Sequence, residues 1–330
     1  MVKHKRHILV VRLSALGDAA MVWPVLKCYA LSHLDTLFTF AGPPLLAPLF
    51  SGVENIEYLP TQKRQKATNL FRQLHSCHPD YVVDLHRVLR TLICDLLFVL
   101  SGVKVAIVKK DRKGRRSLIA HRSDIPLTPI QQRYSDALAK ILGNQPLQLP
   151  EIIADERLDS NGHPSVGIAP FAAHKEKEWG DDHIASVIKE LTLRDVNIRL
   201  FYGANERSRI DQILHKALEQ IDEKKIHLEG AKPFDEQLSD MTRCRVLLTM
   251  DSANLHIATC LGVPVISLWG ATHTNLGFYP QNQDISRAIG KDIPCRPCSA
   301  FGQKPCKWSD YRCMAAIGVN EVIDKIVTYI

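Results

Sequence analysis

The chain has 330 residues, of which 45% are hydrophobic and 23% are charged. This balance is typical of a soluble globular protein and excludes a disordered, collagen-like or low-complexity chain, and the length suggests two domains. Residues 1–160 hold 22 of the Lys/Arg and 14 of the Asp/Glu, whereas the remainder holds 20 and 21. The excess of positive charge in the first half predicts an anionic partner for that half.

Neither a secretory signal nor a membrane-spanning segment is expected. The apolar run after the basic start is interrupted by Arg12, and the uncharged stretch 36–53 contains three prolines and two glycines. Nine cysteines without an export signal predict reduced thiols or a metal site rather than a disulfide framework. We therefore expect a cytoplasmic protein.

Short β-branched runs alternate with amphipathic helical patterns along the whole chain. In the first half, strands are predicted at residues 8–13, 37–40, 56–59, 81–85 and 103–108, and helices at 21–33, 66–76, 89–100 and 131–142. In the second half, strands are predicted at 166–169, 198–202, 226–228, 246–250 and 265–268, and helices at 181–194, 206–220, 234–242, 253–262 and 319–330. This alternation indicates βαβ units and a parallel sheet in each half.

The polar, turn-rich stretch 159–164 marks the predicted boundary, which gives domains 1–160 and 161–330. Two open α/β sheets of this kind, set face to face, place the carboxyl ends of their strands around one interdomain cleft. Ligands of such sheets bind in the loops after the strands, so we expect the chemistry there.

The first candidate residue is Asp18, which follows the first predicted strand and a glycine turn at Gly17. One interpretation is that Asp18 caps the next helix, which is worth about 1 kcal/mol. The other is that its carboxylate points into the cleft and takes part in chemistry. The pattern alone leaves both open.

The second candidate is the stretch 249–256, where an apolar strand ends and a helix begins. Free backbone N–H groups and the helix dipole make such a junction an anion site, although Asp251 and Ser252 are also common capping residues. The chain has no G-x-G-x-x-G and no Walker A sequence, which argues against an NAD-type dinucleotide fold and a P-loop. The third candidate, loop 170–179, is either a solvated loop or a source of a lysine for a diphosphate.

Together these stretches resemble glycosyltransferase family 9, the ADP-heptose:lipopolysaccharide heptosyltransferases. The matching residues are Arg12, Ser14, Leu16, Gly17 and Asp18; Asp84, Leu85 and Arg90; Pro170, Lys177 and Trp179; and Asp251, Ser252, His256, Ala258, Pro264, Gly270 and Thr272. The chain departs from the family pattern at Ala253 and Phe171, where glycine is usual, and at Glu178, where a basic residue is frequent.

The resemblance implies an α/β protein of the GT-B type, with two Rossmann-like doubly wound parallel-sheet domains facing an interdomain cleft. It implies an inverting transfer of heptose from ADP-heptose to a lipid A–Kdo or heptosyl acceptor of the lipopolysaccharide inner core. The N-terminal domain would bind the acceptor and the C-terminal domain the nucleotide sugar. The alternatives are a GT-B transferase that uses another ADP- or UDP-sugar, and a non-catalytic nucleotide- or nucleic-acid-binding protein.

In this scheme Asp18 is the catalytic base, because an attacking hydroxyl must lose its proton. Preorganised donors stabilise the charge on the leaving diphosphate, and no D-x-D pair for a metal ion follows the cleft strands, so no cofactor is expected for catalysis. The predicted diphosphate-binding residues are Lys177, Asp251, Ser252, Ala253, Asn254 and His256. Glu206 either holds a ribose hydroxyl or is a first-turn glutamate favoured by the helix dipole.

The predicted acceptor-binding residues are Arg12, Ser14, His86, Arg90, Lys109, Lys110, Arg112, Arg115 and Arg116. Most of them belong to the basic run 104–116, for which a solvated loop is the default interpretation and nucleic acid a second one. No aromatic residue interleaves these charges, so nucleic acid is not expected. An anionic, membrane-anchored glycolipid fits better, with the protein peripheral on the cytoplasmic face of the inner membrane, where each basic residue contributes about 1 kcal/mol.

Four cysteines crowd together near the end of the chain: Cys295, Cys298, Cys306 and Cys313. Four thiolates can hold a structural Zn²⁺ tetrahedrally. The spacing leaves two alternatives open, a zinc site and free or paired thiols.

Overall fold

The computed structural model describes residues 5–143, 147–153, 155, 157–158, 162–194, 196–217 and 223–330. Their contacts divide the chain into two compact units: residues 1–111 with 128–150, and residues 112–127 with 151–330. Residues 112–127, expected in the first domain, therefore group with the second unit. The predicted boundary segment 159–164 lies in part outside the described residues, at Asp159, Ser160 and Asn161.

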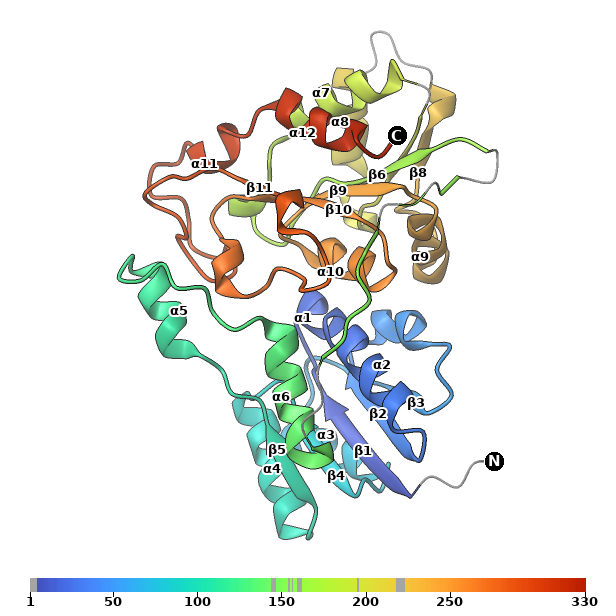
Figure 1. The fold of residues 1–330 in the computed structure, drawn as a ribbon, viewed down its shortest axis with the longest axis vertical. Helices are drawn as coiled ribbons and strands as arrows, with labels where there is room; N and C mark the ends of the chain where they lie inside the picture. The colour runs from blue at the N-terminus through green and yellow to red at the C-terminus, as the bar shows by residue number, and fades with distance from the viewer. Residues whose placement is uncertain are drawn as a thin grey trace. The chain divides into compact units, whose positions relative to one another are not determined.

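The first unit contains a five-stranded parallel sheet in the order β3-β2-β1-β4-β5 (Figure 1). Its strands are β1 (Arg6–Val11), β2 (Thr36–Gly42), β3 (Ile56–Pro60), β4 (Tyr81–Asp84) and β5 (Lys104–Ile107). Its helices are α1 (Leu16–Ala20), α2 (Val22–Ser32), α3 (Ala67–His75), α4 (Leu89–Leu100) and α6 (Ile130–Leu142), with a 3₁₀ turn at η1 (Pro44–Phe50).

The central strand β1 is covered by helices on both faces. Leu9 and Val11 pack in a cluster with Leu70 of α3 and Phe98 of α4. Successive strand residues point to opposite faces, so Ile8, which is also fully buried, lies on the other face. A strand that is buried on both sides reads as a continuous apolar run, which is why the sequence predicted β1.

The second unit contains a six-stranded parallel sheet in the order β11-β10-β9-β6-β7-β8. Its strands are β6 (Ser165–Ala169), β7 (Asn197–Leu200), β8 (Ile226–Leu228), β9 (Val246–Met250), β10 (Val265–Trp269) and β11 (Ala288–Gly290). Its helices are α5 (Arg112–Ile119), α7 (Asp181–Thr192), α8 (Arg207–Ala217), α9 (Phe234–Thr242), α10 (Ala253–Cys260), α11 (Arg312–Ala315) and α12 (Val319–Val327). The 3₁₀ turns are η2 (Lys175–Lys177), η3 (Ala204–Glu206), η5 (Glu223–Lys225), η6 (Thr274–Leu276) and η7 (Ile285–Arg287).

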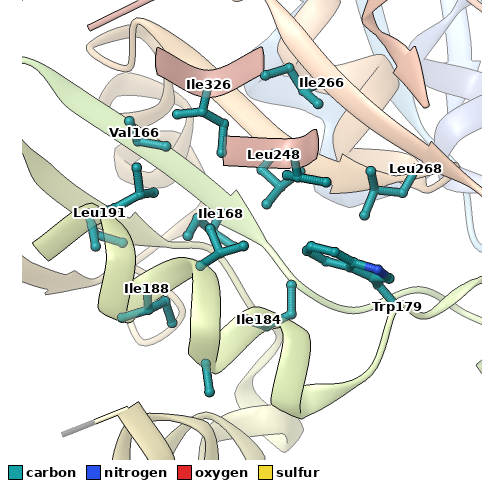
Figure 2. Packing of buried hydrophobic residues seen from close by; sticks show 14 of the residues in the cluster. Val166, Ile168, Trp179, Ile184, Ile188, Leu191, Leu248, Ile266, Leu268 and Ile326 are labelled. Atoms are coloured by element: carbon teal, nitrogen blue, oxygen red, sulfur yellow. The ribbon is translucent and has the colours of Figure 1, made fainter. Parts of the chain in front are cut away.

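The core of the second unit lies between its sheet and the helices α7 and α12. Figure 2 shows Ile184 and Ile188 of α7, Ile326 of α12 and the strand residues Val166 and Leu248 converging on one apolar layer. The terminal helix therefore buries its apolar face on this unit. The described residues contain no helix that is both long enough and apolar enough to cross a membrane.

Apart from the 3₁₀ turns, four described elements were not predicted from the sequence: α1, α5, α11 and β11. α5 carries four basic residues and Gly114, a composition that favours a solvated loop. The structure holds it as a helix because Leu118 packs with Leu127 and Leu276, residues that a sequence pattern does not bring together. The basic run 104–116 is therefore not one loop; β5 belongs to the first unit and α5 to the second.

Candidate functional site

The first turn of α1, where the sequence predicted a glycine turn at Gly17, places Asp18 beside a buried arginine. Arg12 Nη2 donates to Asp18 Oδ2 in an ion pair, and Arg12 Nη1 donates to the Leu85 carbonyl oxygen at 2.7 Å. Although burial opposes it, the neighbouring Tyr134 and Asp18 raise the pKa of Arg12 above its ordinary value. The ion pair fixes the orientation of the Asp18 carboxylate, and the Asp18 side chain as a whole is 15% exposed.

Tyr134 of α6 completes the support of this turn. Its hydroxyl donates to the Asp18 carbonyl oxygen at 3.2 Å, and the Arg12 guanidinium lies 5.9 Å from the centre of its ring. Tyr134 was not predicted as a functional residue from the sequence. It lies 116 residues beyond Asp18, and a tyrosine in a helical pattern gives no signal that distinguishes it from an ordinary core residue.

The loop after β4 brings His86 to the same end of the sheet. Asp84 accepts hydrogen bonds from the backbone N–H groups of His86 at 2.6 Å and Arg87 at 2.9 Å, which fixes the loop. His86 Nε2 lies 3.3 Å from Ser14 Oγ. Burial, reinforced by the cations Arg12, Lys110, Arg90 and Lys63, lowers the pKa of His86 to about 3. His86 is therefore neutral at physiological pH and is surrounded by positive charge.

The first unit thus gathers five of the predicted residues: Arg12, Ser14, Asp18, His86 and Lys110. Arg90 is near them but has a structural role, since its Nη1 donates to the carbonyl oxygens of Lys63 at 2.6 Å and Gln65 at 3.1 Å. Lys109 is exposed directly after β5. The grouping of cations around a neutral histidine and a fixed carboxylate suits an anionic hydroxyl compound.

The remaining predicted acceptor residues lie on α5, in the second unit. Arg112 and Arg116 are exposed, and the Arg115 guanidinium lies 5.3 Å from the centre of the Phe301 ring. The basic run is therefore divided between two units. Sequence proximity grouped these three arginines with Lys109 and Lys110, whereas their contacts place them elsewhere.

The second unit holds its own cluster of predicted residues at the end of β9. Asp251, which is 5% exposed, accepts from Lys177 Nζ at 2.9 Å and from Thr272 Oγ1 at 2.8 Å. Lys177 Nζ also donates to the Asp251 carbonyl oxygen. Gly302 has a φ of +82° and lies against the Lys177 side chain, so that a Cβ at this position would be 2.7 Å from Lys177 Cγ. The predicted loop lysine is thus a buried partner of Asp251 rather than a solvated side chain.

The amino end of α10 follows directly. Ser252 occupies the N-cap position but its side chain does not cap the helix; its Oγ lies 3.1 Å from Thr249 Oγ1. Thr249 Oγ1 in turn donates to the Ala169 carbonyl oxygen at 3.0 Å. The first residues of the helix, Ala253 and Asn254, are half-buried. An uncapped, partly exposed helix start has the geometry that suits an anion, and the binding of a diphosphate there stays a prediction.

His256 and Glu206 have different surroundings. His256 lies one turn into α10 and is 5% exposed, so it is a buried histidine close to the helix start. Glu206 Oε2 accepts from the Gly203 backbone N–H at 2.6 Å. This hydrogen bond closes the turn η3, which is a structural role for Glu206. That Glu206 also binds a ribose hydroxyl stays a prediction.

The other motifs of the second unit have structural roles. Trp179 is 2% exposed and its Nε1 donates to the Ile317 carbonyl oxygen at 3.1 Å. Asp181 begins α7 and is held by Arg209, as expected for an aspartate at a helix start rather than a metal ligand. The guanidinium of Arg209 also lies 4.5 Å from the centre of the Phe171 ring.

All nine cysteines are free thiols, and burial raises the pKa of the Cys298 thiol to about 11. Cys298 Sγ donates to the Cys295 carbonyl oxygen at 3.0 Å. Across the part of the chain that the structure describes, which includes Cys306 and Cys313, no three His, Cys, Asp or Glu side chains are arranged to hold a metal ion. The zinc hypothesis therefore gains no support from the geometry.

Comparisons with known proteins identify the family of this chain. Residues 68–308 match the family model described as glycosyltransferase family 9 (heptosyltransferase). Lipooligosaccharide heptosyltransferase 2 of Campylobacter jejuni is 21% identical over 317 residues, which cover 94% of this chain and 95% of that protein.

Two solved structures share the fold over nearly the whole chain. The E. coli ADP-heptose lps heptosyltransferase II has a TM-score of 0.71 at 18% identity and covers 98% of each chain. The E. coli heptosyltransferase WaaC with ADP-2-deoxy-2-fluoro heptose has a TM-score of 0.69 at 14% identity, covering 98% of this chain and all of that one. The two parallel-sheet units are thus those of a GT-B protein. Because the family model matches well over half of the chain, the protein belongs to glycosyltransferase family 9 and is a transferase enzyme.

Proposed function

We propose that the protein transfers a heptose, with inversion, from ADP-heptose to an anionic acceptor of the lipopolysaccharide inner core. The observation that carries this proposal is the Asp18 carboxylate, held by the buried Arg12, in a chain of this family. An aspartate that only stabilised a helix start would not need a buried arginine as its partner. The two groups of residues described above then serve the two substrates.

The acceptor group lies in the first unit. The acceptor hydroxyl attacks the anomeric carbon of the donor and gives its proton to Asp18. Arg12 holds Oδ2 of the carboxylate, and the second oxygen, Oδ1, is the one we assign to the proton. The cations Lys63, Lys110 and Arg90 around His86 attract the negative charges of the acceptor. His86 is neutral, so it binds a hydroxyl without adding charge.

The donor group lies in the second unit. As the bond between the anomeric carbon and the diphosphate oxygen breaks, its electron pair stays on the departing ADP. The N–H groups at the start of α10, from Ala253 and Asn254, stabilise that charge. The ammonium of Lys177, positioned by Asp251, adds a positive charge beside them. These donors supply the electrostatic stabilisation that a divalent metal provides in other transferases, so no cofactor is required.

The identity of the donor rests on the relatives. One of the two solved structures contains ADP-2-deoxy-2-fluoro heptose, and the other is an ADP-heptose lps heptosyltransferase. We therefore assign ADP-heptose to this chain, with a lipid A–Kdo or heptosyl acceptor. Because such an acceptor is anchored in lipid, we place the enzyme at the cytoplasmic face of the inner membrane.

The test has a binding step and a transfer step. Isothermal titration with ADP-heptose, UDP-glucose and GDP-mannose is expected to show micromolar binding of the ADP-sugar alone. Mass spectrometry is then expected to find one heptose added to a purified Kdo-containing core acceptor. Binding of a UDP-sugar in preference to the ADP-sugar contradicts the donor assignment. Binding of ADP-heptose without transfer to any core acceptor contradicts the acceptor assignment.

A further inference from the structure

Helix α4 of the first unit has an apolar face that the protein leaves exposed. The exposed fractions are 77% for Leu89, 59% for Leu96 and 74% for Leu100. The complete set of exposed apolar residues on this helix is Leu89, Leu92, Ile93, Leu96, Val99 and Leu100. At 100° per residue these six side chains fall within an arc of about 120°.

The opposite face of α4 attaches the helix to the first unit. Thr91, Cys94, Asp95 and Phe98 are buried there, and α4 packs against α3, β4 and β5, beside which it lies in Figure 1. The helix therefore has two faces: a buried one that packs on the first unit, and the exposed apolar stripe on the opposite side. A contiguous stripe of this kind on an otherwise folded protein marks an interaction surface.

The chain on either side of the stripe is rich in positive charge. Residues 61–111 contain nine Lys/Arg and four acidic residues, of which Asp84 and Asp95 are buried. Asp95 is buried on the core side, where burial, followed by the nearby Asp84, raises its pKa to about 8. At the amino end of the helix, Arg90 holds the loop that carries the exposed Arg64 and Lys66. The surface that flanks the stripe is therefore basic.

The apolar stripe and the basic surface beside it together indicate which partner binds this face. A second copy of this chain bound by the same face would bring two basic surfaces against each other, which is unfavourable. An anionic bilayer surface is complementary to both the stripe and the basic surface. The leucines are buried at the boundary of the acyl chains, and the lysines and arginines form ion pairs with the lipid headgroups.

We propose that the exposed face of α4, with the basic loop beside it, docks the first unit on an anionic lipid bilayer. The helix lies in the plane of the interface, with Leu92, Leu96 and Leu100 at the level of the acyl boundary. Arg64 and Lys66 contact the lipid phosphates. The inference rests on the proposed function only in that a lipid-anchored acceptor gives the docking its purpose; the binding itself is independent of sugar transfer.

Vesicle co-sedimentation tests the docking. Wild-type protein is expected to bind vesicles of 30% phosphatidylglycerol in phosphatidylethanolamine and to bind neutral phosphatidylcholine at least tenfold more weakly. Leu96→Gln with Leu100→Gln is expected to lower the partition coefficient on anionic vesicles at least tenfold. The matched control is Leu31→Gln with Leu34→Gln, since these leucines of the same unit are 58% and 68% exposed; it is expected to stay within twofold of wild type.

The charge contribution is tested separately with Arg64→Gln/Lys66→Gln, against Lys189→Gln/Lys304→Gln, which are exposed lysines of the second unit. The variant Arg64→Gln/Lys66→Gln is expected to bind anionic vesicles at least threefold more weakly than wild type at low salt. Most of the salt dependence of vesicle binding is expected to disappear in this variant. The control variant Lys189→Gln/Lys304→Gln is expected to bind like wild type. Equal losses for the α4 and control leucine pairs contradict the proposal.

Two further readouts separate this inference from its rivals. Analytical ultracentrifugation is expected to give the same mass for wild type and Leu96→Gln/Leu100→Gln; a dimer that the double variant dissociates would assign the face to a second copy and overturn the proposal. Transfer to a deacylated, water-soluble core acceptor is expected to be unchanged in that variant. If wild-type protein binds vesicles as described but transfers no heptose, the proposed function fails while the docking stands.

Discussion

Lys177 and Asp251 form a buried ion pair, with side chains 12% and 7% exposed. Lys177→Gln is expected to destabilise the protein by about 3 kcal/mol, because it leaves the Asp251 carboxylate buried without its cation. Lys177→Gln/Asp251→Asn is expected to recover most of that stability but not the affinity for ADP. Urea unfolding and titration with ADP measure the two effects. An affinity for ADP that returns together with the stability would show that Lys177 has no part in binding the diphosphate.

His86 gives the first unit a dependence of stability on acid. Its pKa is about 3 in the folded protein, against an ordinary value of 6.5 for a histidine, so below pH 6.5 the unfolded chain takes up a proton that the folded chain does not. Stability contributed by the neutral imidazole is therefore present above pH 6.5 and is lost as the pH falls toward 3. The loss approaches about 1.4 kcal/mol per pH unit.

His86→Gln is expected to remove this dependence. Urea unfolding at pH 7, 6, 5 and 4 should show the stability of the wild type falling relative to that of the variant as the medium becomes more acidic. A difference between the two proteins that stays constant over this range would mean that His86 titrates normally in the folded state.

Asp95 on the buried face of α4 titrates in the opposite sense. Its pKa is raised from 3.8 to about 8 by burial and then by Asp84, so its protonated form is the stable one. That contribution is fully present below pH 3.8 and is lost as the pH rises through 8. Asp95→Asn mimics the protonated form. We expect the variant to gain stability relative to wild type as the pH rises from 5 to 8, by roughly 1 kcal/mol per unit; a gain on acidification would contradict the assignment.

Helices and strands whose residue pattern and ends are both visible in the local sequence were predicted correctly. β9 was predicted with its observed bounds because a run of five buried apolar or β-branched residues precedes the small polar residues of a helix start. α4 was likewise predicted at 89–100, but its exposed apolar face was not. Periodicity shows that a helix has two faces without showing which neighbours cover them.

The sequence proposed residues for the candidate site, but it could not predict their contacts. Asp18 was proposed from its position after the first strand, and Arg12 and Ser14 from the family resemblance; the structure joins Arg12 to Asp18. The pairing of Lys177 with Asp251 spans 74 positions, and no pattern of one sequence reveals it. The same is true of α5, whose attachment to the second unit depends on packing against residues far along the chain.

At the scale of the whole molecule, the account predicts that sugar transfer needs no divalent metal. The charge of the leaving diphosphate is assigned to backbone N–H groups of α10 and to Lys177, none of which a chelator removes. Transfer measured after dialysis against EDTA is therefore expected to keep at least 80% of its rate. A loss that Mg²⁺ or Mn²⁺ restores would show that the metal, and not the helix start, carries that charge.

The two units are assigned different tasks: the first supplies the base and the second binds the donor. The variant Asp18→Asn separates them, with Asp35→Asn, an exposed aspartate of the same unit, as its matched control. Circular dichroism confirms that both variants fold, and Asp18→Glu provides a second test if the asparagine variant does not.

The most direct measurement is single-turnover heptose transfer by Asp18→Asn, read beside its dissociation constant for ADP-heptose. We expect transfer to fall about 10³-fold, which is the size of a lost general base, while the dissociation constant stays within twofold of wild type. Transfer at a rate close to that of Asp35→Asn would contradict the account, because the reaction would then have another proton acceptor.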